Sequence, residues 1–336
     1  MNLKKLYSQS VLKLKEVSAS PELDVQVLLS YATSKDKTFL LSHPEFEPSK
    51  SQINKFQKLL KKRQNNVPIV YLTGKKEFFG YEFLVTPDVL IPRPESEFLV
   101  EQAVEVLQKK LKIVNCKLKI LDLGTGSGCL IISLAKKLDE LYELSNFINL
   151  YASDISAKAL KMARKNAKKL LFEARGRELS NQAGSRLCSN NTIKFIHSDL
   201  FQNHQLHKKP ASPSGGFDLI IANLPYVPKL VSKCEYKVLS NELETHNTKY
   251  IIHNTVKFEP QNAIFADDNG SEIIKRFLAQ ARNHLAEDGT ILIELDPRNA
   301  MEIEKFSHYH YPTAKIELKK DLAGLDRYLT ISLSSY

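Results

Sequence analysis

The chain has 336 residues, of which 43% are hydrophobic and 26% are charged, and its formal net charge is +10. This composition excludes a disordered chain, and the length allows a substantial core and favours two domains. No apolar run reaches the about 18 residues that a membrane span needs, and no signal-peptide core follows Met1. We therefore expect a soluble cytoplasmic protein that makes no contact with a membrane.

The basic residues occur mostly as dispersed pairs, at 61–63, 109–110, 168–169 and 319–320. Such pairs are typical of the solvated faces of helices, although clustered cations can also bind a polyanion. The four cysteines are scattered, without a Cys-x-x-Cys pair or a histidine at zinc spacing. We expect reduced thiols, no metal site and no requirement for direct contact with nucleic acid.

Residues from about 3 to 65 carry apolar side chains at three- and four-residue spacing, which predicts a small helical bundle. Ser20 and Pro21 predict the start of a helix, with serine as the cap and proline at the first helical position. We assign residues 1–68 to this first domain.

A strand-rich stretch follows the helical bundle. We expect strands at 69–72, 77–79 and 82–85, with Gly74 and Gly80 as turn residues. Residues 69–90 are therefore interpreted as a β-hairpin linker between two domains.

Two prolines then flank Arg93, ahead of a helix expected from about 95 to 110. The segment can be a proline-stiffened loop that only starts the helix. It can also be a rigid gate over an active site, in which Arg93 binds an anionic or carbonyl group. The sequence fits both interpretations.

From about residue 117, strand and helix patterns alternate, which predicts an α/β domain with a parallel sheet covered on both faces. We assign residues 91–336 to this domain. Two polar stretches, 173–191 and 208–216, are interpreted as surface excursions. The expected strands are 118–123, 148–153, 193–197, 217–222, 290–295, 314–318 and 328–333.

The first of these strands breaks into a glycine-rich loop before a helical pattern that begins at Cys129. Glycine suits this turn because the backbone there takes positive φ or passes close to a ligand, although a tight turn without a ligand is the alternative. The glycine spacing differs from the dinucleotide pattern Gly-x-Gly-x-x-Gly, so no pyrophosphate is implied. The predicted cofactor loop consists of Gly124, Thr125, Gly126, Ser127 and Gly128.

Acidic residues end the next two expected strands. Asp154 is placed to accept hydrogen bonds from the ribose hydroxyls of an adenosine-containing cofactor. It can instead cap the following helix, a role that Ser156 can also fill. Asp199 can bind the adenine amino group or can be a simple turn residue. The predicted cofactor site therefore also includes Asp154, Ile155, Asp199 and Leu200.

The apolar run 217–222 ends in Asn223, Leu224, Pro225 and Tyr226. Asn, Pro and an aromatic residue at the end of a strand can hold a planar amino group and present its nitrogen for alkylation. Asn223 Oδ1 and the Leu224 carbonyl are both acceptors, so each can take one N–H of that group. The alternative is an Asx turn that only ends the strand. We interpret these four residues as the catalytic and substrate site, with Asn223 also beside the cofactor.

Together these motifs resemble class I S-adenosylmethionine-dependent methyltransferases and, among them, the peptide-chain release factor glutamine methyltransferases. The resemblance covers most of the chain in the family's order, apart from 173–191, 208–216 and 229–256. It rests further on Leu72-Thr73-Gly74-Lys75-Lys76-Glu77-Phe78, Ile91 to Glu97, Phe258-Glu259-Pro260 and Asp321 to Arg327.

The resemblance implies a Rossmann-like seven-stranded methyltransferase sheet with an N-terminal helical bundle that docks the protein substrate. It implies S-adenosyl-L-methionine as cofactor and a class 1 peptide-chain release factor as partner, methylated on N5 of the glutamine in its Gly-Gly-Gln motif to support translation termination. It also implies that Arg93 and Phe258 contribute to the substrate site. We expect a monomer.

Leu224 departs from the family's usual Asn-Pro-Pro-Tyr, because proline's fixed φ is lost and an N–H is gained. Asn-Leu-Pro-Tyr also resembles the motif of ribosomal RNA adenine dimethyltransferases, so adenine N6 is an alternative target. Glutamine methylation of a ribosomal protein and a binding module without turnover are further alternatives. The helical domain and the segments around Arg93 and Phe258 favour the release factor family.

Overall fold

The structure is a computed structural model that describes residues 3–111, 117–142, 148–172, 193–207, 215–229, 243–245, 248–250 and 255–333. Contacts divide the chain into two compact units. The helical unit comprises Met1–Lys75, Val85–Pro87 and Ile252–Phe258, and the sheet unit comprises Lys76–Leu84, Asp88–Ile251 and Glu259–Tyr336. The stretch 173–191, and most of 208–216 and 229–256, lie outside the described residues. Within the described ranges, no helix has the length and apolar character needed to cross a membrane.

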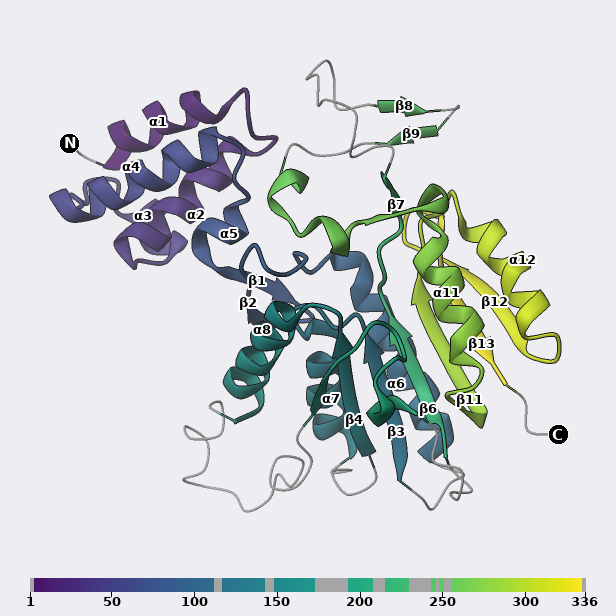
Figure 1. Ribbon diagram of the computed structural model, residues 1–336. Coiled ribbons are helices and arrows are strands. Elements are labelled where there is room, and N and C mark those ends of the chain that lie inside the picture. Colours follow the sequence, from purple (N-terminus) through teal and green to yellow (C-terminus); the bar gives the residue numbers. More distant parts are fainter. Residues whose placement is uncertain are drawn as a thin grey trace. The chain divides into compact units, whose positions relative to one another are not determined.

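In the described part of the helical unit, the α-helices α1 to α5 surround one apolar core (Figure 1). Leu14, Leu28 and Phe56 are almost completely buried in that core, as the apolar spacing predicts. The helix that starts at Pro21 confirms the predicted start, but the Ser20 side chain makes no capping hydrogen bond. The helices are α1 (Leu3–Leu14), α2 (Pro21–Thr33), α3 (Lys37–Ser42), α4 (Lys50–Gln64) and α5 (Ile69–Thr73).

The strand expected at 69–72 is wrong, because these residues form the helix α5. Pro68 precedes the helix and Gly74 ends it with φ of 74°, in the left-handed region that glycine adopts readily. Leu72 packs into the core of the helical unit. This burial outweighs the strand propensity of the β-branched residues in the segment.

Two basic residues that were expected on solvated faces are buried. Arg63 Nε lies 2.7 Å from Asp24 Oδ2, and the Arg63 side chain is only 6% exposed. Lys110 Nζ lies 2.7 Å from Asp288 Oδ2 and also donates to the Asp288 carbonyl. The expectation of solvated faces is therefore wrong for these two cations, which are paired inside their own units.

The sheet unit contains the expected seven strands in the order β12-β13-β11-β6-β3-β4-β5. β13 runs antiparallel to both of its neighbours, which corrects the expectation of a fully parallel sheet. A separate two-stranded sheet of β1 (Lys75–Phe78) and β2 (Tyr81–Leu84) precedes it. The seven strands are β3 (Leu118–Leu123), β4 (Ile148–Asp154), β5 (Lys194–His197), β6 (Phe217–Ala222), β11 (Leu285–Glu294), β12 (Lys315–Lys320) and β13 (Asp326–Ser332).

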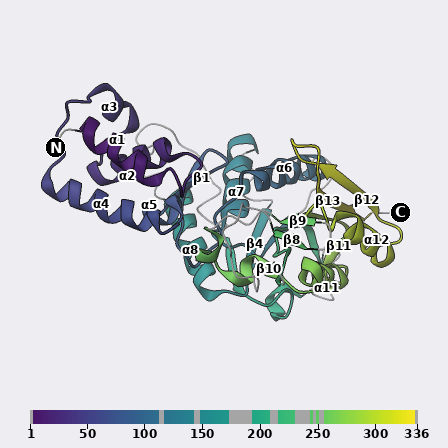
Figure 2. The same cartoon turned by 90° about the horizontal axis from the view of Figure 1, so that it is seen from above.

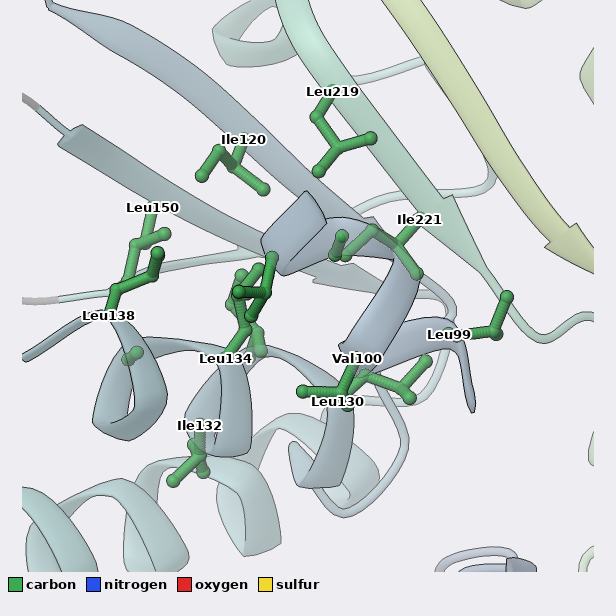
Figure 3. Close-up of a cluster of buried hydrophobic side chains, with 14 of the residues drawn as sticks. Leu99, Val100, Ile120, Leu130, Ile132, Leu134, Leu138, Leu150, Leu219 and Ile221 are labelled. Atoms are coloured by element: carbon green, nitrogen blue, oxygen red, sulfur yellow. The ribbon is translucent and has the colours of Figure 1, made fainter. Parts of the chain in front are cut away.

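Helices cover both faces of this sheet, with α6 and α7 on one face and α11 on the other (Figure 2). Alternation along each strand divides the apolar side chains between the two faces. Ile120 and Leu219 pack against Leu130, Leu134 and other residues of α7 (Figure 3). Ile220 faces the opposite core, where α11 and α12 supply the partners. These helices are α6 (Glu97–Leu111), α7 (Cys129–Tyr142), α11 (Glu272–Ala281) and α12 (Ala300–His310).

Short elements complete the described part of the sheet unit. The helix expected from about 95 begins as a 3-10 turn, η1, and continues as α6. α8 follows β4, and β7 pairs in parallel with β10 beyond the carboxyl end of β6. The bounds are η1 (Pro94–Ser96), α8 (Ala157–Ala167), β7 (Val227–Pro228), β10 (Phe265–Ala266), β8 (Leu243–Thr245) and β9 (Thr248–Tyr250).

Candidate active site

The glycine loop after β3 is shaped by its backbone. Gly124, Gly126 and Gly128 have φ of 79°, 55° and 81°, values that other residues rarely adopt. The N–H groups of Gly124 and Thr125 both donate to the Ser153 carbonyl, at 2.8 and 2.9 Å. The loop is therefore fastened to the end of the neighbouring strand β4.

Asp154, the last residue of β4, holds the loop through its side chain. Its Oδ2 accepts a hydrogen bond from the Gly126 N–H at 2.9 Å, and its Oδ1 accepts one from the Ser156 N–H at 2.8 Å. Burial raises the pKa of Asp154, while these two hydrogen bonds lower it. Ser156 caps α8 by accepting from the Ala159 N–H, so Asp154 is not the helix cap.

Three residues of the loop have contacts that stabilise the loop itself. Thr125 Oγ1 donates to Asp122 Oδ2 at 2.7 Å, and the Ser127 carbonyl accepts from Asn166 Nδ2 at 2.9 Å. A Cβ on Gly128 would lie 2.7 Å from Ile132 Cδ1, so Gly128 permits close packing within and beside α7. These three residues do not line the cavity described below, and their contact with a cofactor stays a prediction.

Asp199 and Leu200 follow β5. Asp199 Oδ2 accepts a hydrogen bond from Arg276 Nη2 at 3.2 Å. Leu200 is buried with φ of 46°, a conformation that costs energy for a non-glycine residue and is often found at functional sites. Ser198 Oγ donates to the Leu200 carbonyl at 2.8 Å and so stabilises this turn.

Asn223 directly follows β6, and the strand register decides where its side chain points. Ala222 pairs in parallel with Ile293, so Asn223 and Glu294 come side by side at the strand ends. Asn223 Nδ2 donates to Glu294 Oε2 at 3.0 Å and to Ser96 Oγ at 2.7 Å. Among the described residues, no donor is recorded for Asn223 Oδ1, which is left as an acceptor.

Leu224 and Tyr226 complete this segment. A Cβ on Gly124 would lie 3.1 Å from Leu224 Cδ2, so the glycine loop passes close to the Leu224 side chain. Tyr226 OH donates to Glu294 Oε1 at 3.1 Å. Burial raises the pKa of Tyr226 well above its usual value, and the Glu294 charge raises it further, so the phenol stays protonated.

These elements surround a cavity of about 220 Å³ at the carboxyl ends of β3, β4, β5 and β6. Ligands of open α/β sheets bind at this edge. Two other segments, 88–90 and 260–263, contribute further lining residues. The predicted site residues that line it are Gly124, Gly126, Asp154, Ile155, Asp199, Leu200, Asn223, Leu224 and Pro225.

Known protein families and individual proteins match this chain. Residues 5–74 match the family described as PrmC N-terminal domain, and residues 115–308 match a methyltransferase domain. A release factor glutamine methyltransferase of Koribacter versatilis is 30% identical over 88% of this chain and 86% of its own length. One of Flavobacterium psychrophilum is 32% identical over 87% of this chain and 85% of its own length. The chain belongs to the release factor glutamine methyltransferase family.

Two further matches extend the comparison. A bifunctional methyltransferase of Rickettsia typhi is 31% identical over 98% of this chain, which spans 57% of that longer protein. A solved release factor-specific protein-(glutamine-N5) methyltransferase of Alicyclobacillus acidocaldarius is 20% identical, with a TM-score of 0.37. The match covers 75% of this chain and all of that one.

Besides the three loop residues, three residues predicted for the substrate site of this methyltransferase do not line the cavity. Arg93 Nη2 forms an ion pair with the buried Glu259 Oε1 at 2.7 Å, and the Arg93 side chain is 35% exposed. Tyr226 lies behind Asn223, against Glu294. Phe258 belongs to the helical unit, so its place in the substrate site stays a prediction, as does that of Arg93.

Sequence reasoning missed the carboxylates behind the cavity wall. Glu294 ends the apolar run of β11, and an acid at the end of such a strand was a usable signal. Glu259 accepts hydrogen bonds from Arg93 and from the Ile91 N–H, the latter at 3.0 Å. Glu259 therefore connects the proline-rich segment around Arg93 to the segment 260–263. No local signal pointed to Ser96, because its role depends on residues 127 and 198 positions away.

Proposed function

We propose that this enzyme transfers the methyl group of S-adenosyl-L-methionine to N5 of the glutamine in the Gly-Gly-Gln motif of class 1 peptide-chain release factors. The observation that carries the proposal is the Asn223 amide at the cavity wall, with its nitrogen bound to Ser96 and Glu294 and its oxygen left as an acceptor. The names of the family's members supply the substrate class.

The residues of the cavity fit an adenosine-containing cofactor. Gly124 and Gly126 expose backbone at the cavity wall because they lack side chains, and Asp154 offers a half-buried carboxylate beside them. Asp154 would hold the ribose hydroxyls, since an ionised carboxylate retains free acceptor positions after two hydrogen bonds. Ile155 and Leu200 provide apolar surface for the adenine ring, and Asp199, which lines the same cavity, would hold the adenine amino group.

The chain's part in the reaction is to aim a poor nucleophile. S-adenosyl-L-methionine, when bound, supplies a methyl group already activated on a sulfonium. The lone pair of a glutamine amide is delocalised, so Asn223 Oδ1 and the Leu224 carbonyl each accept one N–H and direct the nitrogen toward the methyl group. Alignment of this kind can supply roughly 7 kcal/mol or more of the barrier. The nitrogen would gain the methyl group as the carbon–sulfur bond of the sulfonium breaks and S-adenosyl-L-homocysteine leaves, and one N–H proton would pass to water, without a strong base.

The remaining assignments concern the protein substrate. Residues 1–68 are the docking domain for the release factor, residues 69–90 are the linker, and residues 91–336 carry out the transfer. The resemblance also assigns Arg93, Tyr226 and Phe258 to the substrate site, and we keep these three residues as part of the proposal. The enzyme acts as a monomer in the cytoplasm, where translation takes place.

Isotopically labelled S-adenosyl-L-methionine tests the proposal directly. The protein is incubated in parallel with an unmodified release factor and with unmodified small ribosomal subunits, and the label is located by mass spectrometry. Label on the glutamine side-chain nitrogen of Gly-Gly-Gln supports the proposal. Label on RNA adenine would instead establish an rRNA adenine N6-methyltransferase, the alternative that Asn-Leu-Pro-Tyr suggests. Label on a ribosomal protein would also overturn the release factor assignment.

A further inference from the structure

Glu294 is a buried carboxylate that the chemistry above does not use directly. Glu294 is only 1% exposed. It is the last residue of β11 and does not line the cavity. Three side chains nevertheless point donors at it. Ser96 Oγ donates to Oε2 at 2.6 Å, Asn223 Nδ2 donates to the same oxygen at 3.0 Å, and Tyr226 OH donates to Oε1 at 3.1 Å.

This arrangement determines which way the Asn223 amide faces. An ionised carboxylate is an acceptor only, so the Asn223 group 3.0 Å from Oε2 must be the NH₂ and not the oxygen. A flipped amide would place Oδ1 against Glu294 Oε2, with two acceptors in contact in a buried site. Ser96 favours the same orientation of the Asn223 amide. The Ser96 hydroxyl donates its hydrogen bond to Glu294, so its oxygen can only accept one from Asn223 Nδ2.

Burial and the neighbouring groups act on the pKa of Glu294 in opposite directions. Burial raises its pKa, while the hydrogen bonds from Ser96 and Tyr226 and the nearby Arg327 charge lower it. Burial also raises the pKa of Tyr226, so this phenol remains a donor to Glu294. A general-base role does not fit the geometry, because Asn223 lies between Glu294 and the cavity and the three donors occupy both carboxylate oxygens.

We infer that Glu294 is a positioning residue that locks the Asn223 amide with Nδ2 inward and Oδ1 toward the substrate, so that the amide nitrogen of the substrate is aimed correctly. This inference rests on the proposed function. Without the lock, Asn223 presents a donor to the substrate N–H in a fraction of molecules, and those molecules cannot align the nucleophile. A misplacement of this kind costs about 100-fold in rate.

The experiment compares Glu294→Ala and Glu294→Gln with the wild type in release factor methylation. The matched control is Asp218→Ala, which removes another buried carboxylate of the same sheet, one that accepts from the Lys119 N–H at 2.7 Å. We expect Glu294→Ala to lower kcat about 100-fold, with the cofactor Kd and the release factor KM within threefold of wild type. Glu294→Gln should recover kcat to within about tenfold, because its amide oxygen can still accept from Asn223 and Ser96.

Failure of the inference is distinct from failure of the proposed function. If the wild type does not methylate glutamine, the proposed function is wrong. If the wild type is active and Glu294→Ala keeps kcat within threefold of Asp218→Ala, or Glu294→Gln is as slow as Glu294→Ala, Glu294 is not a positioning residue. Should Glu294→Ala fail to fold, the test uses Glu294→Gln alone. The measurement is the NMR resonances of the Asn223 side-chain amide in that variant. Resonances at the wild-type position support the lock, and resonances averaged between two orientations overturn it.

Discussion

The two ends of the cavity are built in different ways. At the glycine-loop end, backbone N–H groups of Gly126 and Ser156 are held by one carboxylate, Asp154, within 28 residues of sequence. At the Asn223 end, the functional amide is held by side chains that lie 71 and 127 residues away. The first end depends on local chain geometry and the second on the assembly of the whole sheet, so each should fail in its own way when it is altered.

The largest effect is expected at the Asn223 end. Asn223→Ala removes the acceptor that aims the substrate nitrogen, so kcat should fall by about 10²–10³-fold, as when a transition-state hydrogen bond is lost. Steady-state methylation of a release factor measures this loss. Asn283→Ala, at an exposed position after α11, is the control and should match the wild type. A kcat within threefold of wild type for Asn223→Ala would refute the assigned role.

The glycine-loop end should fail in cofactor binding. Asp154→Ala removes the acceptor of two backbone N–H groups, and hydrogen bonds to a charged group contribute about 1.5–3 kcal/mol. We expect the KM for S-adenosyl-L-methionine to rise about 10- to 100-fold. Ser49→Ala removes only the cap of α4, worth about 1 kcal/mol of stability, and should leave that KM within threefold because Ser49 does not line the cavity. Equal KM values for the two variants would contradict the assignment of cofactor binding to the glycine-loop end.

A pH dependence of stability should also originate at the glycine-loop end. Burial raises the pKa of Asp122 to about 7, while its hydrogen bond with Thr125 lowers it. The folded state therefore keeps a proton that the unfolded chain has released, and stability falls as the pH rises from about 4 to 7. Relative to Asp122→Asn, the wild type should lose on the order of a few kcal/mol over this range. Denaturant unfolding at pH 4, 5.5 and 7.5 measures the difference, and parallel curves would exclude Asp122 as the source.

A smaller effect tests the ion pair of Arg93 and Glu259. Glu259→Gln weakens the link between two segments that contribute to the cavity wall, so the cofactor KM should rise about fivefold. Arg93→Gln should do the same if Arg93 acts only through Glu259. An increase in the release factor KM alone for Arg93→Gln would instead place Arg93 in the substrate site, as the resemblance implies.

The smallest effect is expected from Leu224→Pro, which restores the family's usual motif. The carbonyl that accepts the substrate N–H is present in both residues, so kcat should stay within about threefold. Loss of the buried Leu224 side chain beside Gly124 should lower the melting temperature by a few degrees at most. A large drop in kcat would indicate that the Leu224 backbone takes a conformation that proline cannot reproduce.

Local patterns predicted where the strands end and where the glycine loop begins, because these features can be recognised along the chain. The strands at 118–123 and 217–222 match β3 and β6, and Asp154 and Asn223 lie at strand ends as expected. The helix at Ile69–Thr73 was missed because burial of Leu72 overrode strand propensity. The partners of Asn223 were missed because the register between β6 and β11, and the placement of Ser96 before α6, are properties of the assembled sheet.

The division between the two ends is tested most directly by isothermal titration of S-adenosyl-L-methionine into the wild type, Asn223→Ala and Asp154→Ala. The account predicts a Kd for Asn223→Ala within threefold of wild type and a Kd for Asp154→Ala raised at least about tenfold. A Kd for Asn223→Ala raised as much as that for Asp154→Ala would contradict it, because Asn223 would then be chiefly a cofactor ligand.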